Sequence, residues 1–310
     1  MGALESLMEL LLDYTSIEEI PKWRRMKKLE ILSLDKCTSL NRFSLVGCTA
    51  SVAKLSLAEI CLTQLPKSIE SFNSLIELDL TWSIIEELPN SIGNMKNLKV
   101  LKMGNSSIKK LPSAIKMLEK LEELEVGGPC FGGEIPSNIR KLRFLRILVL
   151  KSTRISVFLD LYTSRISSLS SDLVLLFQLK QLQLQCHNLQ CLSRIKTTND
   201  LSNLKAFSDL EILDCDELIE IQDLEGSENL RTLKLLTLPS LAESVDLTNL
   251  KKLKKIDLND CTNLSEIQGS TESMEILDYE VFQTTKFARS IKLQESKSLA
   301  YKRTRGRDWF

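Results

Sequence analysis

The sequence predicts an α/β solenoid, in which short repeats stack with a parallel β-sheet on one face and short turns on the other. Three observations support this fold class. Leucine supplies 59 of the 310 residues, the segment L-x-x-L-x-L recurs about every 23 residues, and several repeats share a second half that begins with proline. Aromatic residues make up only 5% of the chain, so leucine is the residue expected to fill the core.

The repeat can be aligned along most of the chain. In each segment the fourth and sixth residues should point inward from a short strand, and the third, fifth and seventh should point outward. For the repeat aligned on Leu210, this places Ile212, Asp214 and Asp216 outward. The segments begin at Leu7, Leu29, Val52, Leu75, Leu98, Leu121, Leu145, Leu179, Leu210, Leu230 and Leu253, with a weak one at Met274. The pattern is that of a leucine-rich-repeat horseshoe, with a parallel β-sheet on the concave face and short helical, 3-10 or irregular turns on the convex face.

The second half of four repeats predicts the convex turns. Each begins at a proline, which presets φ where no N–H is needed, and a nearby serine is expected to cap a short helix or 3-10 turn. Apolar residues follow at steps of three, as at Ile69, Phe72 and Leu75. The prolines are Pro66, Pro89, Pro112 and Pro136, and the serines are Ser68, Ser91, Ser113 and Ser137.

The rhythm of the repeats predicts the domain organisation. Residues 1–280 should form one repeat domain of about 11 to 12 repeats, with irregular long repeats at 151–209, and residues 281–310 a basic tail. The tail from Lys286 onward holds eight basic residues against Glu295 and Asp308, and is expected to be solvated rather than a nucleic-acid arm. Because the first strand begins six residues from the start, without a polar capping unit, the chain is expected to be part of a longer protein or a truncated product.

Composition and motifs argue against catalysis, cofactors and metals. Lys and Arg balance Asp and Glu at 41 each, which favours neither nucleic acid nor a membrane surface as partner. The eight cysteines form no C-x-x-C pair, and Cys37 and Cys261 are expected to be buried, inert thiols at a repeat corner. His187 lies near Cys186 and Cys191 at a spacing that matches no zinc motif, so a structural histidine is favoured. With neither a signal peptide nor a spanning segment in the sequence, a cytoplasmic or nuclear protein is expected.

The form L-P-x-S-I-x-x-x-x-x-L, interleaved with L-x-x-C-x-x-L, resembles the leucine-rich-repeat region of plant intracellular nucleotide-binding immune receptors, closest to those with an N-terminal TIR domain. The resemblance covers roughly residues 7 to 280. It implies a module that senses a pathogen effector, or a host protein altered by one, in the defense response, and that holds an adjoining nucleotide-binding domain inactive. The chain has no G-x-x-x-x-G-K-[ST] loop, so nucleotide exchange is not assigned to it. The matching residues are Leu65-Pro66 with Ser68-Ile69, Leu88-Pro89 with Ser91-Ile92, Leu111-Pro112 with Ile115, Cys37 with Leu40, and Cys261 with Leu264.

Outward positions in the middle of the array form the candidate partner-binding surface. Asp79, Lys102 and Glu125 occupy the same slot of three successive repeats. These charges could pair with each other in a ladder, or form a polar rim for a protein, with Trp82 and Tyr14 as aromatic anchors. The candidate set is Glu77, Asp79, Trp82, Lys102, Glu123, Glu125, Ile147, Val149 and Lys151; the outward aliphatics Ile147 and Val149 require a cover, which the insertion after them could provide.

Two functions fit these observations. The first is protein recognition and autoinhibition within a plant disease-resistance protein, and the second is a free-standing leucine-rich-repeat scaffold or adaptor similar to the plant Ras-group proteins. In both cases the expected partner is a protein, or an intramolecular nucleotide-binding domain if the parent chain is longer.

Overall fold

The computed structural model describes residues 5–19, 26–41, 51–131, 137–152, 176, 178–186, 206–221, 224, 227–269 and 276–278. The chain divides into two compact units, Met1–Arg165 and Ile166–Phe310. We call them unit 1 and unit 2. The irregular interval and the basic tail, at residues 153–175, 187–205 and 279–310, lie outside the described residues.

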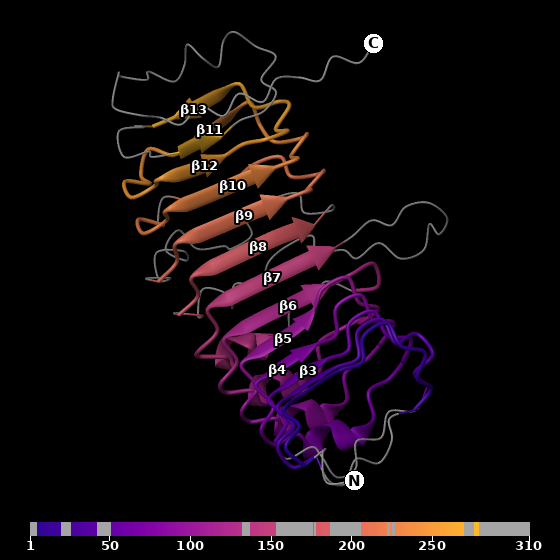
Figure 1. Ribbon diagram of the computed structural model, residues 1–310. Coiled ribbons are helices and arrows are strands. Elements are labelled where there is room, and N and C mark those ends of the chain that lie inside the picture. The colour runs from indigo at the N-terminus through magenta and orange to yellow at the C-terminus, as the bar shows by residue number, and fades with distance from the viewer. Residues whose placement is uncertain are drawn as a thin grey trace, which may run out of the picture. The chain divides into compact units, whose positions relative to one another are not determined.

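Unit 1 is built on a parallel sheet in which consecutive strands are neighbours and run in one direction (Figure 1). Each strand coincides with one of the aligned segments. Equivalent repeat positions pair across neighbouring strands, as Leu55 pairs with Leu78 and Leu78 with Leu101. The strands are β1 (Glu9–Leu11), β2 (Ile31–Ser33), β3 (Lys54–Ser56), β4 (Glu77–Asp79), β5 (Val100–Met103), β6 (Glu123–Gly127) and β7 (Ile147–Ser152).

The inward positions of these strands form the core, as predicted. Leu78 and Leu80 have no exposed surface, whereas Glu77 and Asp79, which alternate with them along the strand, are half-buried and face outward. Each buried leucine removes apolar surface worth about 2 kcal/mol from water. The predicted alternation, and with it the predicted fold class of stacked parallel strands and short turns, is confirmed.

Four 3-10 helices lie on the other half of the unit 1 repeats, at the predicted places, and successive helices pack against each other. They are η1 (Lys67–Ser71), η2 (Asn90–Asn94), η3 (Ser113–Met117) and η4 (Ser137–Lys141). The prediction of serine caps is wrong for η1 to η3. The N-cap residue is the proline itself, with φ between −66° and −68°, and no side chain caps the helix. The Pro66 carbonyl accepts the Ile69 N–H at 3.0 Å, so the fixed ring torsion starts the turn.

A left-handed residue follows the strand in most repeats. Tyr14, Lys36, Glu59, Trp82 and Asn105 have φ between 55° and 60°. All five occupy the eighth repeat position, where the chain turns away from the sheet. Only asparagine among them tolerates this region readily, and a bulky aromatic residue there is strained by about 1 kcal/mol.

The ninth position forms the corner of the repeat. The Cys37 thiol donates to the Leu12 carbonyl at 3.0 Å, and the Cys261 thiol donates to the Leu235 carbonyl at 3.1 Å. Both side chains are at most 1% exposed, and burial raises the pKa of Cys261 to about 11. The prediction that Cys37 and Cys261 are buried at the corner is confirmed.

Unit 2 repeats the parallel arrangement with a different second half. Its main strands are β8 (Gln181–Cys186), β9 (Asp209–Leu213), β10 (Thr232–Leu236), β12 (Lys255–Asp257) and β14 (Ile276–Asp278), in that order. A further parallel pair, β11 (Ser244–Asp246) with β13 (Glu266–Gln268), was not predicted. Two second halves of unit 2 therefore contain a strand, where four second halves of unit 1 contain a 3-10 helix.

The alignment of the repeat at β9 was wrong by three residues. Leu210 and Ile212 are both buried, so the prediction that Ile212 faces outward fails. Asp214 has the left-handed φ of the eighth position, at 48°, and Cys215 is the buried corner. The repeat therefore begins at Phe207, which is 1% exposed and fills the place that leucine fills elsewhere.

Candidate protein-interaction surface

The structure brings most of the candidate residues together on the outward side of β4 to β7. We call this surface the strand face; it comprises Glu77, Asp79, Lys102, Glu123, Glu125, Ile147, Val149 and Lys151. One row runs across the strands through Glu77, Val100, Glu123 and Ile147. A second row runs through Asp79, Lys102, Glu125 and Val149.

The charges of the strand face pair diagonally rather than along the predicted row. The Lys102 ammonium lies 3.8 Å from Glu77 and 3.9 Å from Glu123, because the long lysine side chain reaches the neighbouring row. Glu77 also contacts Lys54 at 3.1 Å. Contacts of this length between half-exposed groups each contribute about 0.5 kcal/mol, so a partner could replace them.

The pair of Glu125 and Lys151 is of another kind. The ammonium lies 2.7 Å from a carboxylate oxygen, and the side chains are only 14% and 24% exposed. Screening by solvent is weaker for such a pair than for the exposed ones. We therefore regard Glu125 and Lys151 as a structural brace at one end of the strand face.

Asp79 and Val149 contribute less to an exposed surface than the sequence suggested. The Asp79 carboxylate accepts the Thr81 N–H at 2.9 Å and the Thr81 hydroxyl at 2.7 Å, which closes a local turn. Val149 is 7% exposed and therefore covered, whereas Ile147 is half-buried. The insertion that was expected to cover this pair lies outside the described residues.

Two aspartates at the seventh position form inter-repeat bonds that sequence reasoning missed. Asp13 accepts the Ser33 hydroxyl at 2.5 Å and the Asp35 N–H at 2.9 Å. Asp35 accepts the Ser56 hydroxyl at 2.5 Å and the Ala58 N–H at 2.9 Å in the same way. The signal was present in the sequence, since an aspartate in one repeat precedes a serine at the fifth position of the next.

The turn edge beside the strand face presents aromatic side chains. Trp82 and Tyr14 are 54% and 74% exposed, and both occupy the eighth position. Between them the Lys36 ammonium sits 4.9 Å from the centroid of the Tyr14 ring and 3.3 Å from the Glu59 carboxylate. Hydrogen bonding to Tyr14, and then to Glu59, raises the pKa of Lys36, which stays charged at neutral pH. We call Tyr14, Lys36, Glu59 and Trp82 the aromatic edge.

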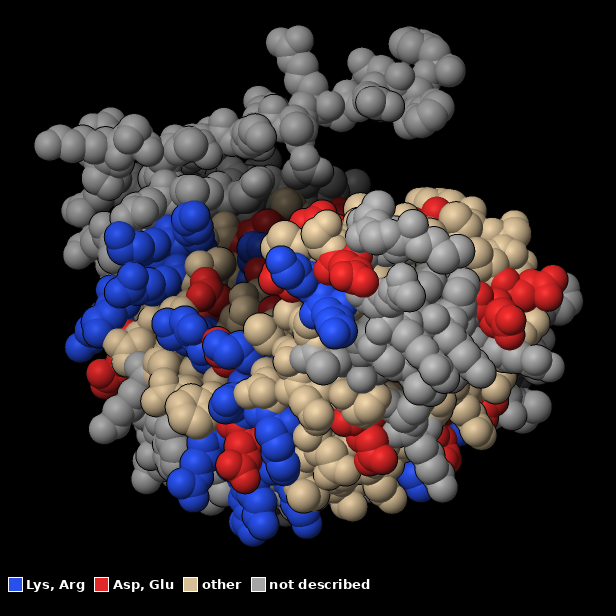
Figure 2. All heavy atoms as spheres, turned by 60° about the horizontal axis from the view of Figure 1, so that its bottom comes forward, with Lys and Arg blue, Asp and Glu red and all other residues tan. Residues whose placement is uncertain are grey.

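Charged side chains of both signs lie on the face of the molecule that Figure 2 presents. Figure 2 shows Lys and Arg side chains gathered toward one side of the viewed face, with single Asp and Glu side chains among them. Among the described residues, no group of three His, Cys, Asp or Glu is placed to hold a metal ion. His187 and Cys191, and the side chain of Cys186, lie outside the described residues.

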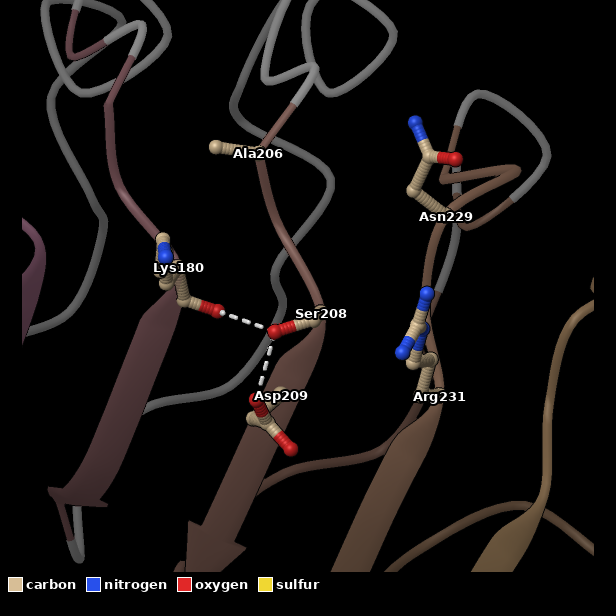
Figure 3. A pocket seen from close by; sticks show the side chains of 6 residues that line it. All are labelled: Lys180, Ala206, Ser208, Asp209, Asn229 and Arg231. Carbon is tan, nitrogen blue, oxygen red and sulfur yellow. Dashed lines mark hydrogen bonds between the residues drawn. The ribbon is translucent and has the colours of Figure 1, made fainter.

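A hollow of about 410 Å³ lies in unit 2, away from the predicted candidates. It is found where β8, β9 and β10 begin (Figure 3). Its lining consists of Lys180, Ala206, Ser208, Asp209, Asn229 and Arg231. None of the helices described here is long and apolar enough to cross a bilayer.

Comparison with known proteins agrees with this geometry. The family described as a leucine-rich repeat region matches residues 6–130. Residues 6–130 thus match a leucine-rich-repeat family, and the stacked parallel strands of the described residues have the fold expected of such repeats. No curated protein matches its sequence. The leucine-rich-repeat domain is similar in structure to an internalin, InlF, from Listeria monocytogenes, with a TM-score of 0.57 and 17% identity over 93% of this chain and 86% of that one.

Two receptor structures share the fold. The TLR13–ssRNA13 complex matches with a TM-score of 0.61 and 20% identity, over 89% of this chain and 47% of that one. The Toll–Spatzle complex of Drosophila matches with a TM-score of 0.60 and 17% identity, over 83% of this chain and 37% of that one. At these identities the likeness concerns the fold alone, and this chain spans less than half of either receptor chain.

Proposed function

We propose that the leucine-rich-repeat domain is a protein-recognition module that binds its partner through the aromatic edge and the strand face of unit 1. The observation that carries the proposal is the exposure of Trp82 and Tyr14. Both are held in a left-handed conformation that disfavours bulky side chains, and both present large ring surfaces to solvent. Trp and Tyr are the residues that most often dominate the binding energy of protein interfaces.

The strand face would supply specificity beside these anchors. The two contacts of Lys102, at 3.8 Å and 3.9 Å, are loose enough for an incoming carboxylate to compete with Glu77 and Glu123. Charges at the rim of an interface affect the association rate and the choice of partner more than the affinity. Glu125 and Lys151 would remain paired and hold the surface in shape.

Co-purification of cross-linked partners from the source tissue tests the proposal. The bait is the full chain, either unaltered or carrying Trp82→Ala or Tyr14→Ala. Phe144→Ala is the matched control, because Phe144 is 60% exposed but lies outside the strand face and the aromatic edge. We expect a defined partner to be lost from Trp82→Ala, weakened by Tyr14→Ala and kept by Phe144→Ala. A partner set that is identical for all four baits would refute the proposed surface.

The finer proposal is that this module serves a plant disease-resistance protein in the cytoplasm. It would sense a pathogen effector or a modified host protein, and would hold an adjoining nucleotide-binding domain inactive until the defense response begins. The support is the L-P-x-S-I form at residues 65–69 and 88–92, whose prolines start η1 and η2. Sequencing of the transcript upstream of Met1 tests it: an in-frame nucleotide-binding region is the expected result.

A scaffold or adaptor of the plant Ras-group type is the second candidate, because that group shares the L-P-x-S-I form. It would use the same surface of unit 1 without controlling a nucleotide-binding domain. A promoter directly upstream, with no such region in frame, would favour the scaffold over the receptor.

A further inference from the structure

The residues just before β8, β9, β10 and β12 of unit 2 form a row along the edge where these strands begin. The Ser208 N–H donates to the Lys180 carbonyl at 2.9 Å, Arg231 to Ser208 at 2.8 Å, and Lys254 to Arg231 at 2.9 Å. These backbone bonds hold the four residues side by side, one in each repeat. We call Lys180, Ser208, Arg231 and Lys254 the start row of unit 2.

Lys180 and Arg231 flank Ser208 within this row and line the hollow of about 410 Å³ (Figure 3). Both side chains are exposed, and neither forms an ion pair with another described residue. The one carboxylate in the lining, Asp209, accepts the Ser208 hydroxyl at 2.6 Å. The lining therefore carries two positive charges and one negative charge, a net charge of +1.

The equivalent row of unit 1 is neutralised from within. Glu122 lies 2.7 Å from Lys99 and 3.7 Å from Arg146, so one carboxylate serves the two cations next to it. The start row of unit 2 has Ser208 in the place between two cations where unit 1 has Glu122. The start row thus lacks the internal anion that the same architecture provides elsewhere.

We propose that the hollow of unit 2 binds an acidic segment of a protein partner, with one Asp or Glu carboxylate held between Lys180 and Arg231. Strands in a sheet lie about 4.8 Å apart, so the two Cα atoms, two strands apart, are separated by about 10 Å. Lysine and arginine side chains are long enough to converge on one oxyanion over that span. Arginine would hold the carboxylate through two N–H groups, and lysine would add a point charge.

The charge balance favours a carboxylate over a nucleic-acid backbone. A net charge of +1 matches one carboxylate, whereas a run of phosphates would place further negative charge beside Asp209. Proteins that bind single-stranded nucleic acid also stack bases on aromatic rings. None of the six residues that line the hollow is aromatic. This site lies in unit 2 and does not depend on the proposed surface of unit 1.

Fluorescence anisotropy at low salt with the full chain tests the proposal. The probe is a fluorescein-labelled peptide of Glu, Gly and Ser, and its counterpart carries Gln in place of Glu. We expect the Glu peptide alone to bind, and Arg231→Gln to weaken it about tenfold, as for the loss of a charge-assisted hydrogen bond. Lys180→Gln should weaken binding less, because a lysine forms only a point contact.

Two further variants separate a specific site from general charge or misfolding. Lys99→Gln removes a cation from the equivalent row of unit 1, and should leave the affinity unchanged. Asp209→Asn can still accept the Ser208 hydroxyl, and should tighten binding by removing the opposing charge. Equal binding of the two peptides, equal effects of Lys99→Gln and Arg231→Gln, or weaker binding by Asp209→Asn would each overturn the proposal. A labelled oligouridylate that binds more tightly than the Glu peptide would point to nucleic acid instead.

Discussion

Unit 1 and unit 2 place the same kinds of side chain inside their sheets but complete their repeats differently. In four repeats of unit 1 the second half contains a 3-10 helix, which at η2 follows directly after Pro89. In unit 2 the described second halves include the strand pair β11 and β13. There Asp246 closes a turn by accepting the Thr248 N–H at 2.8 Å and its hydroxyl at 2.6 Å, which lowers the pKa of Asp246. The inward leucines thus determine how the strands stack, and the residues between them determine which side chains and turns lie on the surface of each unit.

The same contrast applies to charge. Unit 1 neutralises its cations internally, through Glu122 in its start row and through Glu77 and Glu123 around Lys102. Unit 2 pairs Lys234 with Glu211 at 2.8 Å on its strands, but provides no acid between Lys180 and Arg231 in its start row. The two units are therefore suited to different contacts: an aromatic, mixed-charge surface in unit 1 and a cationic hollow in unit 2.

The largest effects are expected from cavities in the two cores. Leu101 in β5 and Leu233 in β10 have no exposed surface, so Leu101→Ala and Leu233→Ala should each lower the free energy of unfolding by about 3 kcal/mol. In repeat folds such damage spreads mainly to neighbouring repeats. Hydrogen exchange should therefore accelerate in β4 to β6 for Leu101→Ala, and in β9 and β10 for Leu233→Ala. If either variant opened both units equally, the division into two units would be wrong.

The next effect concerns close packing of the backbone. Gly127 at the end of β6 has φ of 141°, and a Cβ atom there would lie 1.5 Å from the Lys151 carbonyl oxygen of the next strand. Gly269 in unit 2 has φ of 122°, with its nearest atom 2.8 Å away. Urea unfolding should show a loss of about 3 kcal/mol for Gly127→Ala and about 1 kcal/mol for Gly269→Ala. Equal losses would indicate that the torsion alone, and not the approach to Lys151, determines the effect.

The strands and the 3-10 turns could be predicted because each depends on a short, local pattern. Leucine at the fourth and sixth positions specifies the buried side of a strand, and proline specifies where the outer turn begins. The pattern failed at β9, because Phe207 replaces leucine at the first position and Leu210 then offers a false start. It also failed for β11 and β13, whose pairing involves residues about twenty positions apart without leucine spacing.

The sequence predicted where the charged residues lie on the sheet, but not which of them form ion pairs with each other. Repeat alignment correctly placed Lys102 between Asp79 and Glu125 along one row. It could not show that the lysine side chain reaches Glu77 and Glu123 instead, because side-chain length and rotamer choose among neighbours of similar distance. The hollow at Lys180 and Arg231 was missed for a related reason: its cations belong to the position before each strand, which the strand pattern leaves out.

The third effect contrasts the corners of the two units at alkaline pH. Ser106 in unit 1 donates to the Met103 carbonyl at 2.8 Å, while the buried Cys261 in unit 2 fills the same repeat position. Burial raises the pKa of Cys261 from 9.0 to about 11, so the folded state holds this proton more tightly than the unfolded state. The stabilisation is therefore complete below pH 9 and is lost as the pH rises to about 11, amounting to about 3 kcal/mol.

Cys261→Ser isolates this contribution, because serine keeps a donor and removes the titration. The difference in unfolding free energy between the unaltered chain and Cys261→Ser should shrink between pH 9 and pH 11. Other groups titrate in this range, but they cancel in the difference. A difference that stays constant across the range would mean that the thiol is not held protonated by burial.

The smallest effect on stability gives the sharpest test of the charge contrast. Glu122→Gln removes the anion between Lys99 and Arg146, and so gives unit 1 a cationic row like that of unit 2. An exposed pair contributes only about 0.5 kcal/mol, so the protein should stay folded. Hydrogen bonding to Lys99 lowers the pKa of Glu122. The stabilisation by the charged Glu122 carboxylate is therefore complete above pH 4.5 and is lost as the pH falls through the lowered pKa. The unaltered chain and the variant should converge in stability at strongly acidic pH.

The same substitution should transfer acidic-peptide binding between the units. In an Arg231→Gln background, where the hollow of unit 2 is disabled, Glu122→Gln should restore weak binding of the Glu peptide, measured by anisotropy at neutral pH. Lys99→Gln, added to that double variant, should remove the restored binding, because the new site needs both cations. If Glu122→Gln restores nothing, then two cations that flank an uncharged residue in the row are not sufficient for binding. The enclosure around Ser208, rather than charge alone, would then distinguish the two units.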